Sequence, residues 1–564
     1  MERLSTFDVA DPSRDALERT YAPIIAAVEQ ADSPEDLLTA VSRWDEQRCV
    51  NGTWRSLVGQ RAALFRAHIS RVLSETHADE LSAFMQGKDA TIQRLLLAHR
   101  HADTLRETFG DQACALWESE ASAFDASIEA DLVAEAKLSS RYSELRSNAS
   151  IVWRGEEQNL SQLYGLREHP DADARREGLG AFWGWHEAHA DEIDAIFDEL
   201  VQLRDGMAKR LGMRDFVELG YRRMQRIGYN REDVARLRQQ VLDHVVPLCA
   251  RIRAQQAERY GHDHVAYVDE AVLFPDREPR PGGTTAQKTV AAQEMFDAMD
   301  PALGSFFRTM VDKELLDLEA RSGKQPGGFC TDFPTEGVPF IFANFDGSKS
   351  DVRVFTHEAG HAYQMWSSRE QPLVDYRMAT YESCEIHSMS LEFLTWPHME
   401  LFFGDEADQF RRVHLADALL FLPYGCAIDA FQHWVYENPA ASPAERREAW
   451  SRLERSFLPW RRNEGLPLLE AGGFWHRQAH VFQAPFYYID YVLAGICALQ
   501  FWRASEEAPA EALARYRALC ALGGSRAFGE LASFAGLRSP FESGCLTEVA
   551  AHAAAYLGLD GFDA

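Results

Sequence analysis

The sequence lacks paired cysteines, long apolar runs and an export signal. Its nine cysteines occur singly and without a C-x-x-C pair, which argues against a disulfide framework and against a cysteine-based zinc site. No uninterrupted apolar run approaches 18 residues, and residues 1–8 have no apolar core of the kind that a signal peptide needs. We therefore expect free thiols in a soluble, cytoplasmic protein.

Positive charge is also scarce. The 564 residues include 58 Lys and Arg against 87 Asp and Glu, so the formal net charge is −29. A chain with this balance offers no basic face for phosphates, which argues against nucleic acid and anionic membranes as partners. The acidic balance favours solubility and a preference for neutral or cationic substrates. The length allows two or more domains, or one large enzyme with lobes.

The first 200 residues are patterned as helices. Ser33-Pro34-Glu35-Asp36 has the form of a helix start, with a serine cap, proline at the first helical position and acids near the positive end of the dipole. Residues 39–50 and 57–73 place apolar side chains three and four residues apart. We expect residues 1–200 to form an N-terminal helical lobe and residues 201–564 to form a catalytic region.

Two later stretches favour extended structure. Residues 265–268 and 271–274 are rich in apolar and β-branched residues, and a loop with prolines and glycines follows before a helix over residues 286–303. Residues 327–334 and 338–345 are also expected to be strands. Residues 340–345 precede the candidate metal helix and could align a peptide through backbone hydrogen bonds, or could be a core strand with no role in binding.

A candidate metal site is present in His357-Glu358-Ala359-Gly360-His361. Histidines four residues apart share one face of a helix, so both imidazoles can bind one zinc ion. Glu358 is placed to act as general base on a water at the open position of the zinc. Gly360 costs about 1 kcal/mol of helix propensity relative to alanine, which suggests that another segment packs closely against it.

Zinc in a hydrolase needs a third protein ligand. Three glutamates, Glu382, Glu385 and Glu392, fall near one face of the next helical segment. One carboxylate could bind the metal and another could orient a ligand histidine. Spacing alone does not choose between Glu382 and Glu385, and a solvated helix face is the alternative.

An aromatic cluster lies near the C-terminal end, between Trp475 and Tyr491. Tyr488 and Tyr491 are three residues apart, hence neighbours on a helix that follows Pro485. Phenol or imidazole donors there could stabilise a developing oxyanion. The alternative is an aromatic stripe that belongs to the core.

Together these motifs make the chain resemble the thimet oligopeptidase family of zinc metallopeptidases, and within it the oligoendopeptidase F and Pz-peptidase branch. The matching strings, in chain order, are G-G-F-C-T, F-A-N-F-D-G, V-F-T-H-E-A-G-H-A-Y-Q, E-S-C-E-I-H-S-M-S-L-E-F and H-V-F-Q-A-P-F-Y-Y-I-D-Y. Weaker matches at residues 153–157 and 216–221 extend the resemblance over most of the chain.

The resemblance implies roles for particular residues. It implies Glu385 as the third zinc ligand and leaves Glu382 and Glu392 as outer partners. It also implies that His480, Tyr488 and Tyr491 face the metal. The loop after His480 reads Val-Phe-Gln-Ala-Pro, where the thimet branch is glycine-rich. This departure puts the mobility of the loop in question.

The resemblance also implies a fold and an activity. The fold is mainly α, a two-lobed, clam-like zincin with a deep substrate channel and a small β-sheet beside the zinc helix. The activity is internal cleavage of short, unfolded peptides with one Zn²⁺ per chain. Two alternatives are a zinc carboxypeptidase or aminopeptidase that trims peptide ends, and a non-catalytic helical protein that binds peptides. The oligomeric state stays open.

Overall fold

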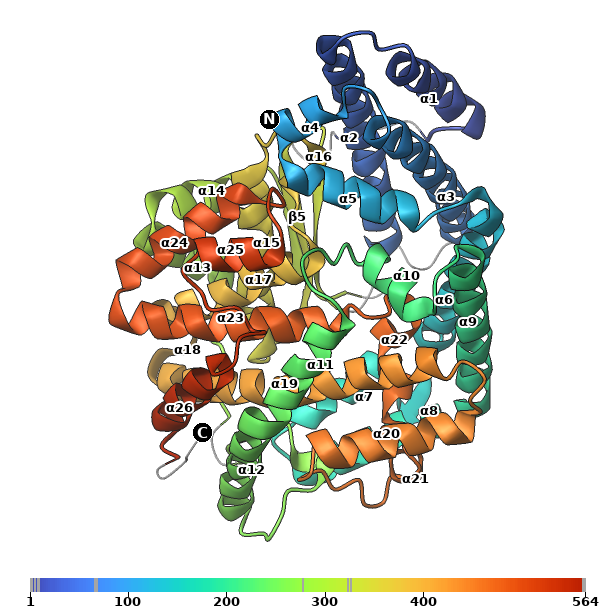
Figure 1. Ribbon diagram of the computed structural model, residues 1–564. Coiled ribbons are helices and arrows are strands. Elements are labelled where there is room, and N and C mark those ends of the chain that lie inside the picture. The colour runs from blue at the N-terminus through green and yellow to red at the C-terminus, as the bar shows by residue number, and fades with distance from the viewer. Residues whose placement is uncertain are drawn as a thin grey trace.

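The N-terminal third is a set of helices that gather on one side of the molecule (Figure 1). The computed structural model describes residues 4, 7, 11–64, 69–275, 278–321, 324 and 327–559. The helices up to residue 210 are α1 (Arg14–Glu29), α2 (Pro34–Leu64), α3 (Ile69–Leu97), α4 (Ala102–Phe109), α5 (Asp111–Ser122), α6 (Glu129–Ser147), α7 (Leu160–Gly165), α8 (Ala172–Ala188) and α9 (Ala190–Arg210). A short hairpin, β1 (Ile151–Trp153) with β2 (Glu156–Gln158), interrupts them.

A helix cap formed by Ser33 determines where α2 begins. The Ser33 hydroxyl accepts a hydrogen bond from the Asp36 backbone N–H at 3.1 Å, and the Asp36 carboxylate accepts from the Ser33 N–H at 3.1 Å. This reciprocal pair satisfies two donors that a helix start leaves without partners. The predicted helix start is confirmed, and α2 covers residues 39–50. Of the predicted helix over 57–73, residues 65–68 lie outside the described residues.

The chain packs around two hydrophobic cores. The smaller core is built from buried residues between Leu17 and Trp117, with Tyr376 added from α16 (Val374–Arg377) and Leu373 from the position before it. Arg48 of α2 donates to both Asp375 oxygens, at 2.8 and 2.6 Å, and so attaches the N-terminal helices to α16. Residue 200 lies inside α9, whose buried face belongs to the larger core. The division at residue 200 remains a proposal.

The middle of the chain continues as helices and a three-stranded sheet. Its elements are α10 (Phe216–Arg223), α11 (Arg231–Gln240), η4 (Val241–Val245), α12 (Val246–Tyr260), α13 (Thr285–Met299), α14 (Pro301–Asp312), β3 (Leu316–Glu319), β4 (Phe329–Phe333) and β5 (Val338–Phe345). The strands over 329–333 and 338–345 confirm the prediction. Residues 265–274 were wrongly expected to be extended: residues 267–269 form one short 3₁₀ turn and the rest of the segment is irregular.

The sheet order is β3-β5-β4, with β5 parallel to β3 and antiparallel to β4. Both edges of β5 are therefore hydrogen-bonded to neighbouring strands. A peptide cannot add to a strand whose two edges are occupied. The expectation that residues 340–345 align a peptide is wrong. The edge strand beside the metal helix is β4.

The remaining helices form the body of the molecule. They are α15 (Ser350–Ser368), α17 (Tyr381–Leu394), α18 (Glu400–Phe403), α19 (Ala407–Glu437), α20 (Pro443–Phe457), α21 (Pro467–Glu470), α22 (Ala479–Gln483), α23 (Tyr488–Glu507), α24 (Pro509–Leu522), α25 (Phe528–Phe534) and α26 (Cys545–Leu557). In Figure 1, α15, α17 and α23 lie together beside β5. The result is a mainly α fold with a small sheet next to the metal helix, as predicted.

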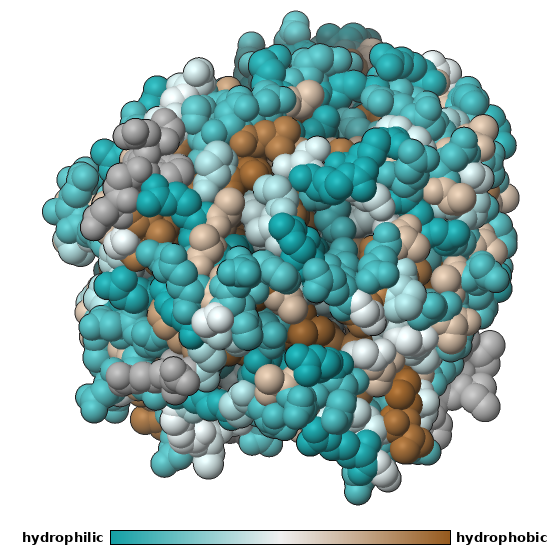
Figure 2. Space-filling view, turned by 90° about the horizontal axis from the view of Figure 1, so that it is seen from below, coloured by the Kyte–Doolittle hydropathy of each residue, from teal (hydrophilic) through white to brown (hydrophobic). Residues whose placement is uncertain are grey.

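The apolar residues of this part of the chain lie mostly inside the protein. The stretch Glu400–Glu437 is long and apolar enough to cross a membrane, but 78% of its most apolar window is buried inside the protein, as in the core helix of a soluble fold. All nine cysteines are free, and only Cys330 is more than slightly exposed. The face in Figure 2 is largely hydrophilic, with hydrophobic residues in small separate groups.

Candidate metal centre and active-site cleft

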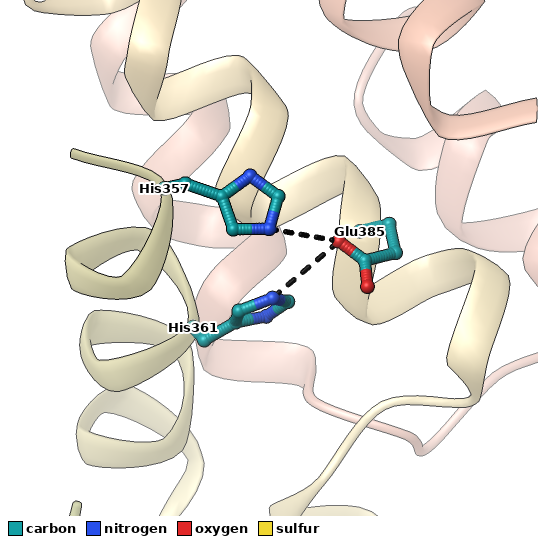
Figure 3. A group of neighbouring side chains, drawn as sticks. All are labelled: His357, His361 and Glu385. Atoms are coloured by element: carbon teal, nitrogen blue, oxygen red, sulfur yellow. Dashed lines mark ion pairs between the residues drawn. The ribbon is translucent and has the colours of Figure 1, made fainter. Parts of the chain in front are cut away.

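Two packed helices bring three candidate metal ligands together. His357 and His361 extend from α15, and Glu385 extends from α17 toward both (Figure 3). The Glu385 Oε2 atom lies 3.2 Å from His357 Nε2 and 3.4 Å from His361 Nε2. One donor atom from each residue lies within 4.8 Å of the other two. Glu385 is 2% exposed, so its charge would be costly without a cation close by.

This donor set fits zinc. Two imidazole nitrogens and one carboxylate oxygen make up the ligand set of zinc hydrolases, which leaves a further position for water. The group consists of histidine and carboxylate donors. The structure therefore brings together the three residues that the sequence and the resemblance had named as ligands.

A hydrogen-bonded chain orients the candidate ligand His357. Its Nδ1 atom lies 2.7 Å from Glu392 Oε1, and His414 Nε2 lies 2.7 Å from the other Glu392 oxygen. The Trp396 indole donates to His414 Nδ1 at 2.9 Å, which leaves the proton of His414 on the nitrogen that faces Glu392. Burial opposes ionisation of Glu392, but the bonds from the two histidines outweigh it and lower its pKa to about 2. Such a carboxylate fixes the ring of a metal ligand.

Glu382 is turned away from the candidate metal ligands His357, His361 and Glu385, called the metal group below. Its Oε1 atom accepts a hydrogen bond from the Thr380 hydroxyl at 3.2 Å, and the side chain is buried. Burial raises its pKa to about 7. The geometry therefore separates the two glutamates that spacing could not separate: Glu385 faces both histidines and Glu382 faces neither.

Tyr487 contacts the metal group and was missed by sequence analysis, which had singled out its neighbours. Its hydroxyl donates to Glu385 Oε1 at 2.6 Å, while the Ser388 hydroxyl donates to Oε2 at 2.9 Å. The Y-Y pair in the sequence was the available clue. The position of Tyr487 just before α23 decides which of the two rings points at Glu385.

Replacement of Tyr487 by phenylalanine tests this contact. The variant should bind zinc roughly 10- to 100-fold more weakly, because an outer hydrogen bond to a ligand carboxylate is lost. Competition with a chelator of known affinity measures the change. Tyr381→Phe is the matched control, since the centroid of the partly exposed Tyr381 ring lies 5.3 Å from that of Tyr487 and the ring packs on it without contacting Glu385. Equal zinc affinity in both variants would contradict the role of Tyr487.

Glu358 lines the cleft beside the ligands. It is 6% exposed, and burial raises the pKa of its carboxyl, which makes it a better proton acceptor. A Cβ atom added to Gly328, just before β4, would lie 3.4 Å from Glu358 Oε1 and 2.9 Å from the Val354 side chain. The glycine thus lets the edge of the sheet approach the candidate general base.

Aromatic donors form the opposite wall. The His480 ring lies 5.1 Å from the ring of Tyr488 and 5.8 Å from the ring of Tyr491, and all three residues line the cleft with Glu358. Burial lowers the pKa of His480 to about 4, so the imidazole is neutral at pH 7. Burial raises the pKa of the Tyr488 hydroxyl, which keeps its proton available for donation.

Gln478 orients His480, and sequence analysis had not singled it out. The Gln478 amide donates to His480 Nδ1 at 2.9 Å, which leaves the proton on Nε2. The Tyr424 hydroxyl in turn donates to the Gln478 carbonyl oxygen at 2.7 Å. Because Tyr424 comes from α19, the sequence could not show that the two residues meet.

The cleft that holds these groups is a cavity of about 590 Å³. Its lining runs from the metal helix and Gly328 to α19 and the segment around His480. A cavity of this size accommodates a short stretch of extended peptide, and a folded domain is too large to enter it.

Comparisons with known proteins agree with this geometry. Residues 274–551 match the family described as peptidase family M3, and residues 4–124 match the peptidase M3 N-terminal domain. The solved structure of Pz peptidase A with an inhibitor is 40% identical, covers 99% of both chains and superposes with a TM-score of 0.96. The chain belongs to peptidase family M3. It is a metallopeptidase, as the resemblance implied.

Two further structures are similar to this peptidase over its whole length. A protein assigned to oligoendopeptidase F is 40% identical, with a TM-score of 0.96 and coverage of 100% of this chain and 99% of the other. A second, from Bacillus anthracis strain Ames, is 38% identical, with a TM-score of 0.92 and the same coverage. Comparison with curated proteins finds no match. The predicted branch, oligoendopeptidase F and Pz peptidase, is confirmed.

Proposed function

We propose that this peptidase is a zinc-dependent oligoendopeptidase with one Zn²⁺ per chain. The observation that carries the proposal is the group of His357, His361 and Glu385, whose member His357 lines the same cleft as Glu358. The names of the similar proteins, an oligoendopeptidase F and a Pz peptidase, support peptides as the substrate.

Each cleft residue has a chemical task in this proposal. His357, His361 and Glu385 would hold the zinc, which when bound would supply a Lewis acid that lowers the pKa of a water. Glu358 accepts the proton of the attacking water and passes it to the leaving amine. His480, Tyr488 and Tyr491 donate hydrogen bonds to the oxyanion of the scissile carbonyl or to the substrate backbone. Glu392 and Tyr487 hold the ligand side chains in position.

The cleft also limits which substrates can reach the site, by their size and flexibility. Only a flexible chain can reach the cavity wall at His357 and Glu358, so short peptides should be cut and folded proteins spared. The free edge of β4, which begins just after Gly328, can pair with an extended peptide in the role first expected of β5.

The proposed setting is the cytoplasm. Nine free thiols favour a reducing compartment, and the acidic net charge disfavours nucleic acid and membranes as partners. The proposed partners are oligopeptide substrates. The oligomeric state stays open.

A digest of a mixed peptide library tests the function. Mass spectrometry should find internal cuts that a chelator abolishes and that zinc restores, with one zinc per chain by metal analysis. Peptides blocked at both ends should also be cut, because an endopeptidase needs neither terminus. Cleavage confined to free ends would favour a carboxypeptidase or aminopeptidase. Binding without any cleavage would favour the non-catalytic alternative.

A further inference from the structure

One wall of the cleft carries arginines interleaved with aromatic rings. The guanidinium carbons of Arg167 and Arg477 lie 4.3 and 4.6 Å from the centroid of the Tyr164 ring. Those of Arg477 and Arg461 lie 5.0 and 4.5 Å from the centroid of the Phe474 ring. All five residues line the cavity. Arg477 is therefore the middle cation of three.

The two outer arginines are neutralised and the middle one is not. Arg167 pairs with Glu168 at 3.0 Å, and Arg461 pairs with Glu270 at 3.0 Å. Among the described residues, no carboxylate forms an ion pair with Arg477, and its buried Nε atom has no hydrogen-bond partner. Ring contacts cover the faces of a guanidinium and leave its edge free to donate hydrogen bonds. The buried Nε–H of Arg477 is therefore a donor that has no acceptor among the described residues.

The rest of the cleft wall, like Arg477, is predominantly positive. Away from the metal group its lining includes three carboxylates, Glu168, Glu270 and Asp417. It includes six cations, Arg167, Arg253, Lys349, Arg353, Arg461 and Arg477. One of these cations, Lys349, pairs at 3.0 Å with Glu278 outside the lining, so five cations against three carboxylates remain in this part of the wall of a chain with net charge −29. Because a cleft focuses the field of its lining, local charge matters more to a bound ligand than net charge does.

Arg477 is close to the reacting groups. Its guanidinium lies 6.0 Å from the ring of Tyr424, and that ring lies 5.6 Å from the ring of Tyr488. Tyr488 in turn contacts His480, opposite the metal ligands. An extended peptide advances about 3.3 Å per residue, so a group bound at Arg477 is a few residues from the bond that is cut.

We propose that Arg477 is a subsite for a carboxylate of the peptide substrate, an inference that rests on the proposed peptidase function. The planar guanidinium can donate two parallel hydrogen bonds to a carboxylate, and the rings of Tyr164 and Phe474 hold its plane in place. In a peptide the carboxylate is either the C-terminus or an aspartate or glutamate side chain. The cleft therefore favours anionic peptides, the reverse of the preference expected from net charge.

Matched peptides test the subsite. A parent peptide with one acidic side chain and a free C-terminus is compared with its C-terminal amide and with its Glu→Gln analogue. The wild-type enzyme should cut one of the two neutralised peptides with a kcat/KM roughly 10- to 100-fold lower, the range for a hydrogen bond to a charged group. Which peptide loses activity identifies the source of the carboxylate.

The variants Arg477→Met and Arg477→Lys complete the experiment. Arg477→Met should lower kcat/KM for the parent peptide to the level of the impaired analogue, and should leave the analogue near its wild-type rate. Arg477→Lys, which keeps the charge, should recover part of the difference. Arg452→Met removes an exposed charge from α20 and should change neither rate.

Two results would overturn the subsite. Equal wild-type kcat/KM for all three peptides would mean that no carboxylate is recognised. An equal loss on every peptide in Arg477→Met would assign Arg477 to packing. Equilibrium binding of the three labelled peptides to Glu358→Gln reports the same preference without turnover. A zinc-loaded wild-type enzyme that cuts no peptide would refute the proposed function, while this binding experiment would still decide the subsite.

Discussion

Glu358→Gln should lose roughly 10²- to 10⁴-fold in kcat, the contribution of a general base, while it keeps its zinc. The amide has the shape of the carboxylate but cannot accept the proton of the attacking water. Glu358 is not in the ligand group, so the change leaves all three metal ligands in place. Turnover of an internally quenched peptide measures the activity, and elemental analysis measures the zinc.

The matched control is Glu370→Gln, just beyond the end of α15. The Glu370 side chain is 88% exposed and lies outside the cleft, so the same change of charge there should leave kcat unaltered. Wild-type turnover in Glu358→Gln would refute the role of Glu358 as general base. Zinc loss in that variant would show that Glu358 holds the metal site together.

Gly360→Ala should destabilise the protein and weaken its zinc site together. A Cβ atom at Gly360 would lie 2.6 Å from both the His387 carbonyl oxygen and Ser388 Cα, which are backbone atoms of α17. The two helices would have to separate, at a cost of about 1–3 kcal/mol, the usual range for overpacking. The same movement would draw His361 away from Glu385, so zinc affinity and activity should fall with stability.

Gly184→Ala is the control for helix propensity. Gly184 lies inside α8, where an added Cβ would meet no atom within 4 Å. That variant should gain about 0.5–1 kcal/mol. Denaturant unfolding and chelator competition on both variants measure the two effects. A stable Gly360→Ala protein with wild-type zinc affinity would contradict the close packing of α15 on α17.

Local chemistry made much of the fold predictable. The Ser33 cap, the two strands around residues 327–345 and the helix around H-E-x-x-H depend on neighbours in the sequence, and each is present. The prediction failed at residues 265–274, where apolar and β-branched residues suggested strands. Tyr267 and Val268 are buried there in a single 3₁₀ turn, which shows that burial without a strand can account for such a composition.

The sequence by itself determined which residues could bind the metal. Four-residue spacing on a helix places His357 and His361 on one face, whatever surrounds them. It also placed Glu358 next to the ligands, and the motifs together indicated the family. It suggested the reason for Gly360 as well, since a glycine inside a helix calls for a close neighbour.

Only the tertiary structure decided which groups from different helices meet. It turned Glu385, which the resemblance had already indicated, toward both histidines, paired Glu392 with His357 and His414, and turned Tyr487 toward Glu385. It also placed Arg477, which forms no ion pair with a carboxylate of the described residues, in the wall of the cleft of an acidic protein. These contacts depend on the packing of α15, α17, α19 and α23, and spacing within one helix carries no information about the helix beside it.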